Sequence, residues 1–151
     1  MNRAYVDGLK MLARRELSEA QVRQRLTRGE HDVEAIELAI TRLKEERAID
    51  DARTAGAIAR TETAVKRHGR FRVTRAIESA GIARSTAKRA VDDVFAALDD
   101  TTLMEAALAK RLRGRASIAD NAEFARLYRY LVGQGFEPDA VVRILESRRR
   151  G

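Results

Sequence analysis

The residues best suited to chemistry in this chain are cationic, and they concentrate in its middle. Between Lys66 and Arg89 a single acid, Glu78, accompanies eight basic side chains. These are Lys66, Arg67, Arg70, Arg72, Arg75, Arg84, Lys88 and Arg89. Such a density of cations suits the phosphates of a nucleic acid or an acidic protein surface. The alternative is a solvated helix face, because Arg72 and Arg75 lie opposite the apolar side of the expected helix. We predict that this stretch binds a partner.

Further predicted contacts lie outside that stretch: Arg14, Arg15, Arg53 and Arg60. Glutamates follow Arg14 and Arg15 closely, which favours a solvated helix face for that pair. The terminal run 148–150 consists of arginines that could contact phosphate or complement the dipole of the last helix. Tyr128 and Tyr130 could stack on bases, although Tyr128 lies on the apolar side of its helix, which favours a place in the core.

Signals for catalysis or metal binding are lacking. There is no cysteine, and His31 and His68 lie far apart in the sequence, so we expect no metal site. The acidic pair Asp50 and Asp51 stands just before a helix, where capping is the expected role. Segment 112–115 is too short for a phosphate loop, and no nucleophile or dinucleotide motif occurs. We predict a protein that is not an enzyme and needs no cofactor.

Composition indicates a helical, basic protein. Of its 151 residues 35% are charged, 5% are aromatic and one is proline, which favours helices over sheets. The formal net charge is +7, and the middle third is the most basic. The beginning of the chain lacks the apolar run of a signal peptide, and no stretch approaches the roughly 20 apolar residues of a membrane span. We therefore expect a cytoplasmic protein without membrane contact.

Helical spacing of apolar residues predicts nine helices, each with start and stop signals. Expected start signals are Ser18, Asp32, Asp50, Thr102, Asp120 and Pro138. Ser18 and Thr102 each have a partner three residues later, the spacing of a capping box. The buried faces of the third and sixth helices are expected to include Val33 and Leu98, respectively.

Three helix-ending glycines, Gly29, Gly81 and Gly135, recur at intervals of 52 and 54 residues. Each follows one apolar-faced helix and precedes another, which indicates a structural repeat. The first copy is slightly out of register, since its last apolar residue lies three positions before the glycine rather than four. We predict an all-α fold of three tandem three-helix-bundle repeats, with boundaries at 1–49, 50–98 and 99–151.

The best local pattern spans the join between the first two repeats, Leu43–Ala55, and a second run covers Leu12–Ser18. With Gly69–Val73, Gly81–Ile82 and Gly135–Phe136, these residues resemble the RecX family, which regulates the RecA recombinase. The resemblance covers nearly the whole chain and rests on a pattern rather than on a catalytic motif.

Three positions depart from that family's pattern. Arg47 replaces a usual glycine, so it must either adopt a left-handed cap or end its helix differently. Thr54 replaces a usual aromatic residue, which should thin the packing between the first two repeats. Gly133 and Gln134 stand where basic residues are common, which weakens the expectation of a partner contact there.

The resemblance implies an elongated, curved arrangement of the repeats, lying along the groove of a RecA filament on DNA. It also implies inhibition of filament growth, ATP hydrolysis, strand exchange and repressor co-cleavage, and hence a role in DNA repair, recombination and the SOS response. Single- or double-stranded DNA could bind the basic middle repeat of an expected monomer. Two alternatives stay open: a helix-turn-helix DNA-binding regulator that uses Lys88 and Arg89, and a helical-repeat adaptor for another protein.

Overall fold

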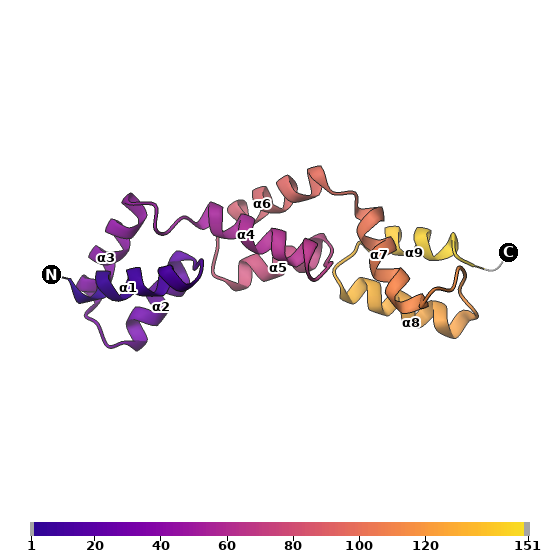
Figure 1. Cartoon of the computed structure of the whole chain (residues 1–151), viewed down its shortest axis with the longest axis horizontal. Helices are drawn as coiled ribbons and strands as arrows, with labels where there is room; N and C mark the ends of the chain where they lie inside the picture. The colour runs from indigo at the N-terminus through magenta and orange to yellow at the C-terminus, as the bar shows by residue number, and fades with distance from the viewer. Residues whose placement is uncertain (1, 150–151) are drawn as a thin grey trace. The chain divides into compact units, whose positions relative to one another are not determined.

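The computed structural model describes residues 2–149 and confirms the prediction of an all-helical chain (Figure 1). Its helices are α1 (Arg3–Arg14), α2 (Glu19–Arg28), α3 (Val33–Glu45), α4 (Asp51–Ala64), α5 (Arg70–Ser79), α6 (Arg84–Ala97), α7 (Asp100–Leu112), α8 (Asn121–Gly133) and α9 (Pro138–Glu146). The only β-type pairing in the described residues is an isolated bridge between Ile118 and Arg149. No helix among them is both long and apolar enough to cross a membrane.

Several helices begin at the predicted residues because short polar side chains accept the first free amides. Ser18 Oγ accepts from the Gln21 amide at 3.1 Å, and the Gln21 side chain accepts from the Ser18 amide at 2.9 Å, which completes the capping box. Asp120 likewise accepts from the Glu123 amide at 2.8 Å. The prediction for α7 was wrong: Asp99 is the cap, not Thr102, and Asp99 accepts from the Thr101 amide.

Three further local predictions were wrong. Asp32 occupies the N-cap position of α3 but makes no side-chain capping bond. The first residue of that helix, Val33, is 76% exposed, because a side chain in the first turn can point away from the bundle. Leu98, expected in the buried face of α6, follows the end of that helix and is 37% exposed.

The helix-ending turns explain why the first repeat looked out of register. Gly29 has φ −77° and is not left-handed; the next residue, Glu30, takes the left-handed conformation with φ 63°. Gly81 and Gly135 have φ 79° and 100°. Glu30 therefore lies four residues after Leu26, the spacing of the other copies. The three turns are in register, and only the residue type in the first was misleading.

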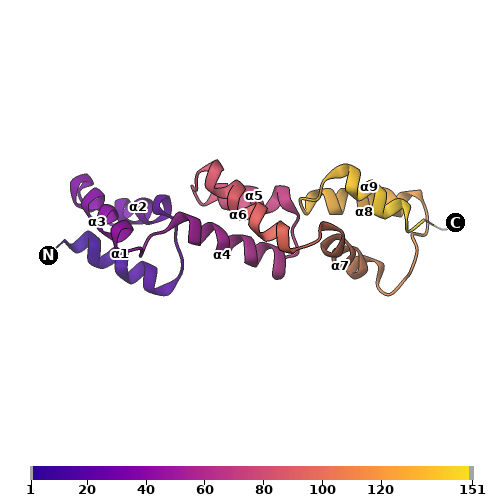
Figure 2. The same ribbon diagram turned by 90° about the horizontal axis from the view of Figure 1, so that it is seen from above.

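Contacts divide the chain into two compact units, and each is described by itself. The first comprises Met1–Ile58 and Ile77–Ala90, the second Ala59–Ala76 and Val91–Gly151. In the first unit α1, α2 and α3 pack on one another, and in the second α7, α8 and α9 do so (Figure 2). Helices α4 to α6 each contribute residues to both units.

Each of the two packed bundles encloses its own hydrophobic core. The first core includes fully buried leucines at 17, 26 and 43, and the second includes fully buried leucines at 108, 131 and 145. Burying one such side chain contributes about 1.5–3 kcal/mol. Gly8 permits the close packing of α1 on α3, since a Cβ there would lie 2.8 Å from Leu43 Cδ1. The cores hold the helices that present the charged surfaces.

The join after α3 has an unusual residue at its turn. Arg47 adopts φ 58°, the left-handed cap in the position where glycine was expected. The Ala48 amide then reaches back to the Leu43 carbonyl at 2.8 Å, the bond that closes such a helix end. Thr54 is buried, and its hydroxyl lies 3.2 Å from Glu16 Oε1. Thr54 thus forms a hydrogen bond at the position where the family pattern has an aromatic residue.

Candidate partner-binding surfaces

The predicted contact residues are well placed for a partner in one respect: most of them are exposed. Arg67 and Arg70 are half-buried, and the other ten side chains are exposed. In the second unit lie Arg60, Lys66, Arg67, Arg70, Arg72 and Arg75, and in the first lie Arg14, Arg15, Arg53, Arg84, Lys88 and Arg89. The basic stretch from residue 66 to 89 is therefore shared between two units, and its role in binding stays a prediction.

In the second unit, the start of α5 is anchored on the turn after α8. The Gly69 amide donates to the Gln134 carbonyl at 2.8 Å, and the Phe71 amide donates to the Gly135 carbonyl at 3.0 Å. The two segments touch closely enough that a Cβ on Gly135 would lie 2.4 Å from Arg72 Cβ. Two of the amides at the beginning of α5 are thus satisfied by carbonyls of the turn after α8. This anchoring fixes where the arginines of α5 emerge.

Two of those arginines are tethered, and one is not. Arg70 pairs with Asp92 at 2.7 Å, and its guanidinium lies 5.3 Å from the centre of the Phe95 ring. Arg72 donates to Gln134 Oε1 at 2.7 Å and to the Gly133 carbonyl at 3.2 Å. Arg75 forms no ion pair or side-chain hydrogen bond with any described residue. Arg75 is thus the member of the group most available to a partner.

A buried ionisable pair joins the last turn of α4 to the turn that follows it. His68 and Glu62 are each 8% exposed, and His68 Nδ1 contacts Glu62 Oε2 directly. Lys66 lies 3.5 Å from the same carboxylate, and Arg67 has a left-handed φ of 57°. His68 lies in the turn between α4 and α5, and its side chain is buried there.

In the first unit, Arg53 has a structural role that its sequence position did not reveal. Its guanidinium lies 2.9 Å from Glu16 Oε1 and donates to the Arg47 and Ala48 carbonyls at 2.8 and 3.2 Å. Those carbonyls follow the end of α3, so Arg53 satisfies acceptors of the turn. A contact by Arg53 with a partner would compete with these bonds. That prediction is the weakest of the set.

Arg14 and Arg15 lie at and just after the end of α1, beside a groove of about 420 Å³. Lys10 and Arg25 also line this groove, together with the apolar Met11 and Leu26. At its edge His31 Nε2 lies 2.8 Å from Asp7 Oδ2. The structure thus adds two cations to the predicted pair.

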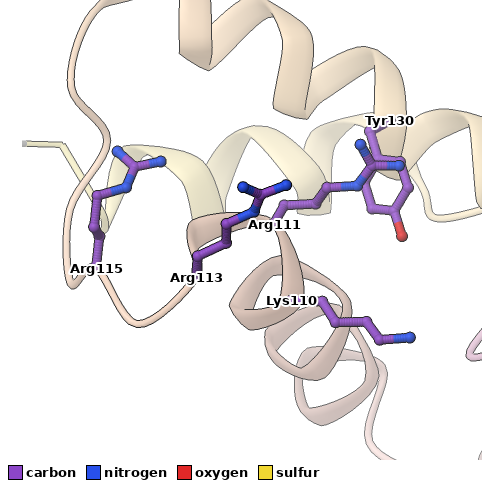
Figure 3. Close-up of a pocket in the computed structure, with 5 residues that line it drawn as sticks. All are labelled: Lys110, Arg111, Arg113, Arg115 and Tyr130. Carbon is purple, nitrogen blue, oxygen red and sulfur yellow. The ribbon is translucent and has the colours of Figure 1, made fainter.

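The second unit contains a hollow that is more cationic than the groove beside α1, and it was not predicted from the sequence. Its volume is about 760 Å³. Figure 3 shows its lining residues, which are Lys110, Arg111, Arg113, Arg115 and Tyr130. The Arg111 guanidinium lies over the Tyr130 ring, 3.8 Å from its centre (Figure 3). Four cations within six residues around the end of α7 are the sequence pattern that could have indicated this hollow. We call it the α7–α8 basic pocket.

One carboxylate stands beside this pocket and is already engaged. Arg115 binds Glu123 through two bonds of 2.9 and 2.5 Å, and the Ala119 amide donates to Glu123 at 2.8 Å. These hydrogen bonds, first from Arg115 and then from Ala119, lower the pKa of Glu123 to about 2. Glu123 therefore stays ionised near neutral pH and holds Arg115 in place.

Two of the three arginines in the terminal run 148–150 contact side chains of the described residues. Arg148 pairs with Glu105, and Arg149 lies 3.0 Å from Glu146 and stacks on Phe124. Arg150 lies outside the described residues. Within the described part of the chain, no cluster of three or more histidine or carboxylate side chains is placed to hold a metal ion.

Comparison with known proteins identifies relatives along the chain. Residues 4–43 match the family model described as RecX, first three-helix domain. The protein Regulatory protein RecX from two strains of Acidithiobacillus ferrooxidans is 29% identical over 143 residues, covering 94% of this chain and 88% of the relative. These relatives are named as regulatory proteins rather than as enzymes.

Solved structures share the fold at low sequence identity. The crystal structure of RecX from Lactobacillus salivarius is 20% identical, with a TM-score of 0.77 over 95% of both chains. A second crystal structure, of regulatory protein RecX, is 19% identical with a TM-score of 0.77, covering 96% of this chain and 70% of the other. The nine-helix order in residues 2–149 is therefore an established fold.

Proposed function

We propose that this chain, which belongs to the RecX family of regulatory proteins, binds a RecA filament on DNA and restrains the recombinase. The observation that carries the proposal is similarity to a regulatory RecX protein along 94% of the chain, together with the shared fold. On this proposal the protein inhibits filament growth, ATP hydrolysis, strand exchange and repressor co-cleavage.

The surface proposed to meet the filament includes the arginines of α5. Arg70 and Arg72 are held by Asp92 and Gln134, so their positions are defined before binding. Arg75 is exposed and has no side-chain partner in the described residues. A set of cations that is partly held in place loses less conformational entropy when it binds an anionic partner.

The test is the rate of ATP hydrolysis by RecA on single-stranded DNA, with and without this protein. We expect inhibition by the native chain and weaker inhibition by the Arg75→Gln variant. The control is Arg28→Gln, which removes one charge from an exposed residue at the end of α2 in the other unit. Circular dichroism of both variants should stay native, because neither side chain is buried.

Three outcomes count against the proposal. The native chain could leave the hydrolysis rate unchanged, which would remove the claim of inhibition. Arg75→Gln and Arg28→Gln could weaken inhibition equally, which would remove the role of α5. The chain could instead bind bare duplex at the same salt while leaving the filament unaffected, which would favour the helix-turn-helix regulator.

A further inference from the structure

We propose that the α7–α8 basic pocket binds the phosphate backbone of a nucleic acid strand without reading its bases. Four cations line it, and the carboxylate beside it, Glu123, is already bound by Arg115 and by the Ala119 amide. The pocket is separate from the arginines of α5 assigned above to the filament, and its test needs no recombinase.

The acids that lie nearest the pocket cations in the sequence already have other partners. Glu105 of α7 pairs with Arg148, and Asp120 accepts the Glu123 amide at the start of α8. Lys110 and Arg113 form no ion pair or side-chain hydrogen bond with the residues that the structure describes. Cations near the C-terminal end of α7 interact favourably with the negative end of its helix dipole. The dipole does not, however, account for a hollow that is lined by four cations and an aromatic ring.

The pocket is held in shape by a chain of side chains that reaches α5. Arg111 lies over the Tyr130 ring, and Tyr130 Oη accepts from Gln134 Nε2 at 3.1 Å. Gln134 Oε1 in turn accepts from Arg72 at 2.7 Å. Arg111 is thus positioned before a ligand arrives, with its guanidinium edge available for hydrogen bonds. Such preorganisation reduces the entropy lost on binding.

The chemistry of the lining selects phosphate rather than bases or an apolar protein surface. The Tyr130 ring is covered by Arg111 on one face and packs against the hydrophobic core, so it offers no free platform for a base. A protein interface commonly needs an apolar centre, whereas this hollow is lined by four cationic side chains. Phosphates are repeated, fully charged acceptors that match several neighbouring Arg and Lys donors.

The test is fluorescence anisotropy of a labelled oligo-dT strand with the full chain, titrated between 50 and 200 mM salt. The variant Lys110→Gln/Arg113→Gln removes two exposed cations with no side-chain partner in the described chain. The control Arg3→Gln/Arg28→Gln removes two exposed cations from the first unit. Both doubles carry the same net charge, so any difference between them is positional.

Each phosphate contact contributes about 0.7 to the slope of log affinity against log salt for a single strand, so losing two should reduce the slope by about 1.4. If the curves converge at 1 M salt, the pocket variant should bind about 25-fold more weakly at 0.1 M. The control should stay within about twofold of the native chain, because neither of its arginines lines the pocket.

Equal slopes and affinities for the two doubles would overturn the proposal, as would undetectable binding of oligo-dT by the native chain at 50 mM salt. A polyglutamate peptide of equal charge that binds as tightly as the oligonucleotide would assign the pocket to acidic polypeptides instead. Failure here leaves inhibition of the recombinase unaffected, since that inhibition is measured in a separate assay with different variants.

Discussion

Gly135 should be the glycine least tolerant of substitution in the second unit, and three glycines make a graded test of why. A Cβ at Gly135 would lie 2.4, 2.5 and 3.0 Å from Cβ, N and Cα of Arg72, and φ there is 100°. At Gly114 φ is 85°, but no atom lies within 4 Å of an added Cβ. Gly133, the last residue of α8, has neither restriction.

The expected magnitudes follow from these differences. A left-handed alanine costs about 1–2 kcal/mol, so Gly114→Ala should destabilise by about that amount. Gly135→Ala adds about 1–3 kcal/mol of steric repacking, because backbone rather than a flexible side-chain end must move, which gives a total of about 2–5 kcal/mol. Gly133→Ala should stabilise by up to about 0.5–1 kcal/mol, because alanine is the better helix former.

The assay is thermal unfolding followed by circular dichroism at 222 nm, with urea denaturation to obtain free energies. For a chain of this size 1 kcal/mol corresponds to about 2–4 °C, so Gly135→Ala should lower Tm by about 4–20 °C. The order of stability should be Gly133→Ala, native, Gly114→Ala, Gly135→Ala. If Gly135→Ala is no worse than Gly114→Ala, the turn after α8 does not press on α5, and the reasoning fails.

Three further predictions concern other sites. Ser18→Ala should lower the unfolding free energy by about 1–3 kcal/mol in urea, because it removes the α2 cap and a buried bond to the Ala80 carbonyl; a loss below about 0.3 kcal/mol would contradict the capping argument. Glu30→Gly should stabilise by about 0.5–1 kcal/mol in the same assay, because glycine adopts the left-handed φ of 63° without strain; a lower Tm would refute this. Arg115→Gln should reduce the acid sensitivity of the urea midpoint. The pKa of Glu123 is about 2 in the folded protein against an ordinary 4.5, so its stabilisation is present above pH 4.5 and is lost as pH falls towards 2. Unchanged acid sensitivity would show that this ion pair does not stabilise the fold.

Helix starts and ends could be predicted where one local side chain decides them. Ser18 and Asp120 cap their helices as expected, since each accepts an amide only a few residues away. Asp99 caps α7 in place of Thr102, because its side chain accepts the Thr101 amide, a bond that the capping-box spacing of Thr102 did not reveal. At Glu30, residue type pointed to the glycine before it, whereas backbone geometry put the left-handed turn one residue later.

The candidate surfaces were harder to predict because charge density along the chain is not charge density in space. Arg53 was predicted to contact a partner, yet its guanidinium is already bound to the Glu16 carboxylate and to two backbone carbonyls. The four cations of the α7–α8 basic pocket lie within six residues, but Tyr130 lies 15 residues beyond Arg115, so the sequence did not show that these residues line one hollow. Pairings across helices depend on tertiary packing, which a pattern of single residues does not encode.

The first turn of α4 supplies bonds that complete the bundle before it. The Asp51 carboxylate accepts the Glu19 amide at the start of α2 at 2.9 Å, while Arg53 binds the Arg47 and Ala48 carbonyls beyond the end of α3. A fragment ending at residue 49 would lose the acceptor for that amide and the donor for those carbonyls. The first bundle is therefore complete only together with the opening turn of α4, and a truncated form that keeps this bundle intact must extend beyond Arg53.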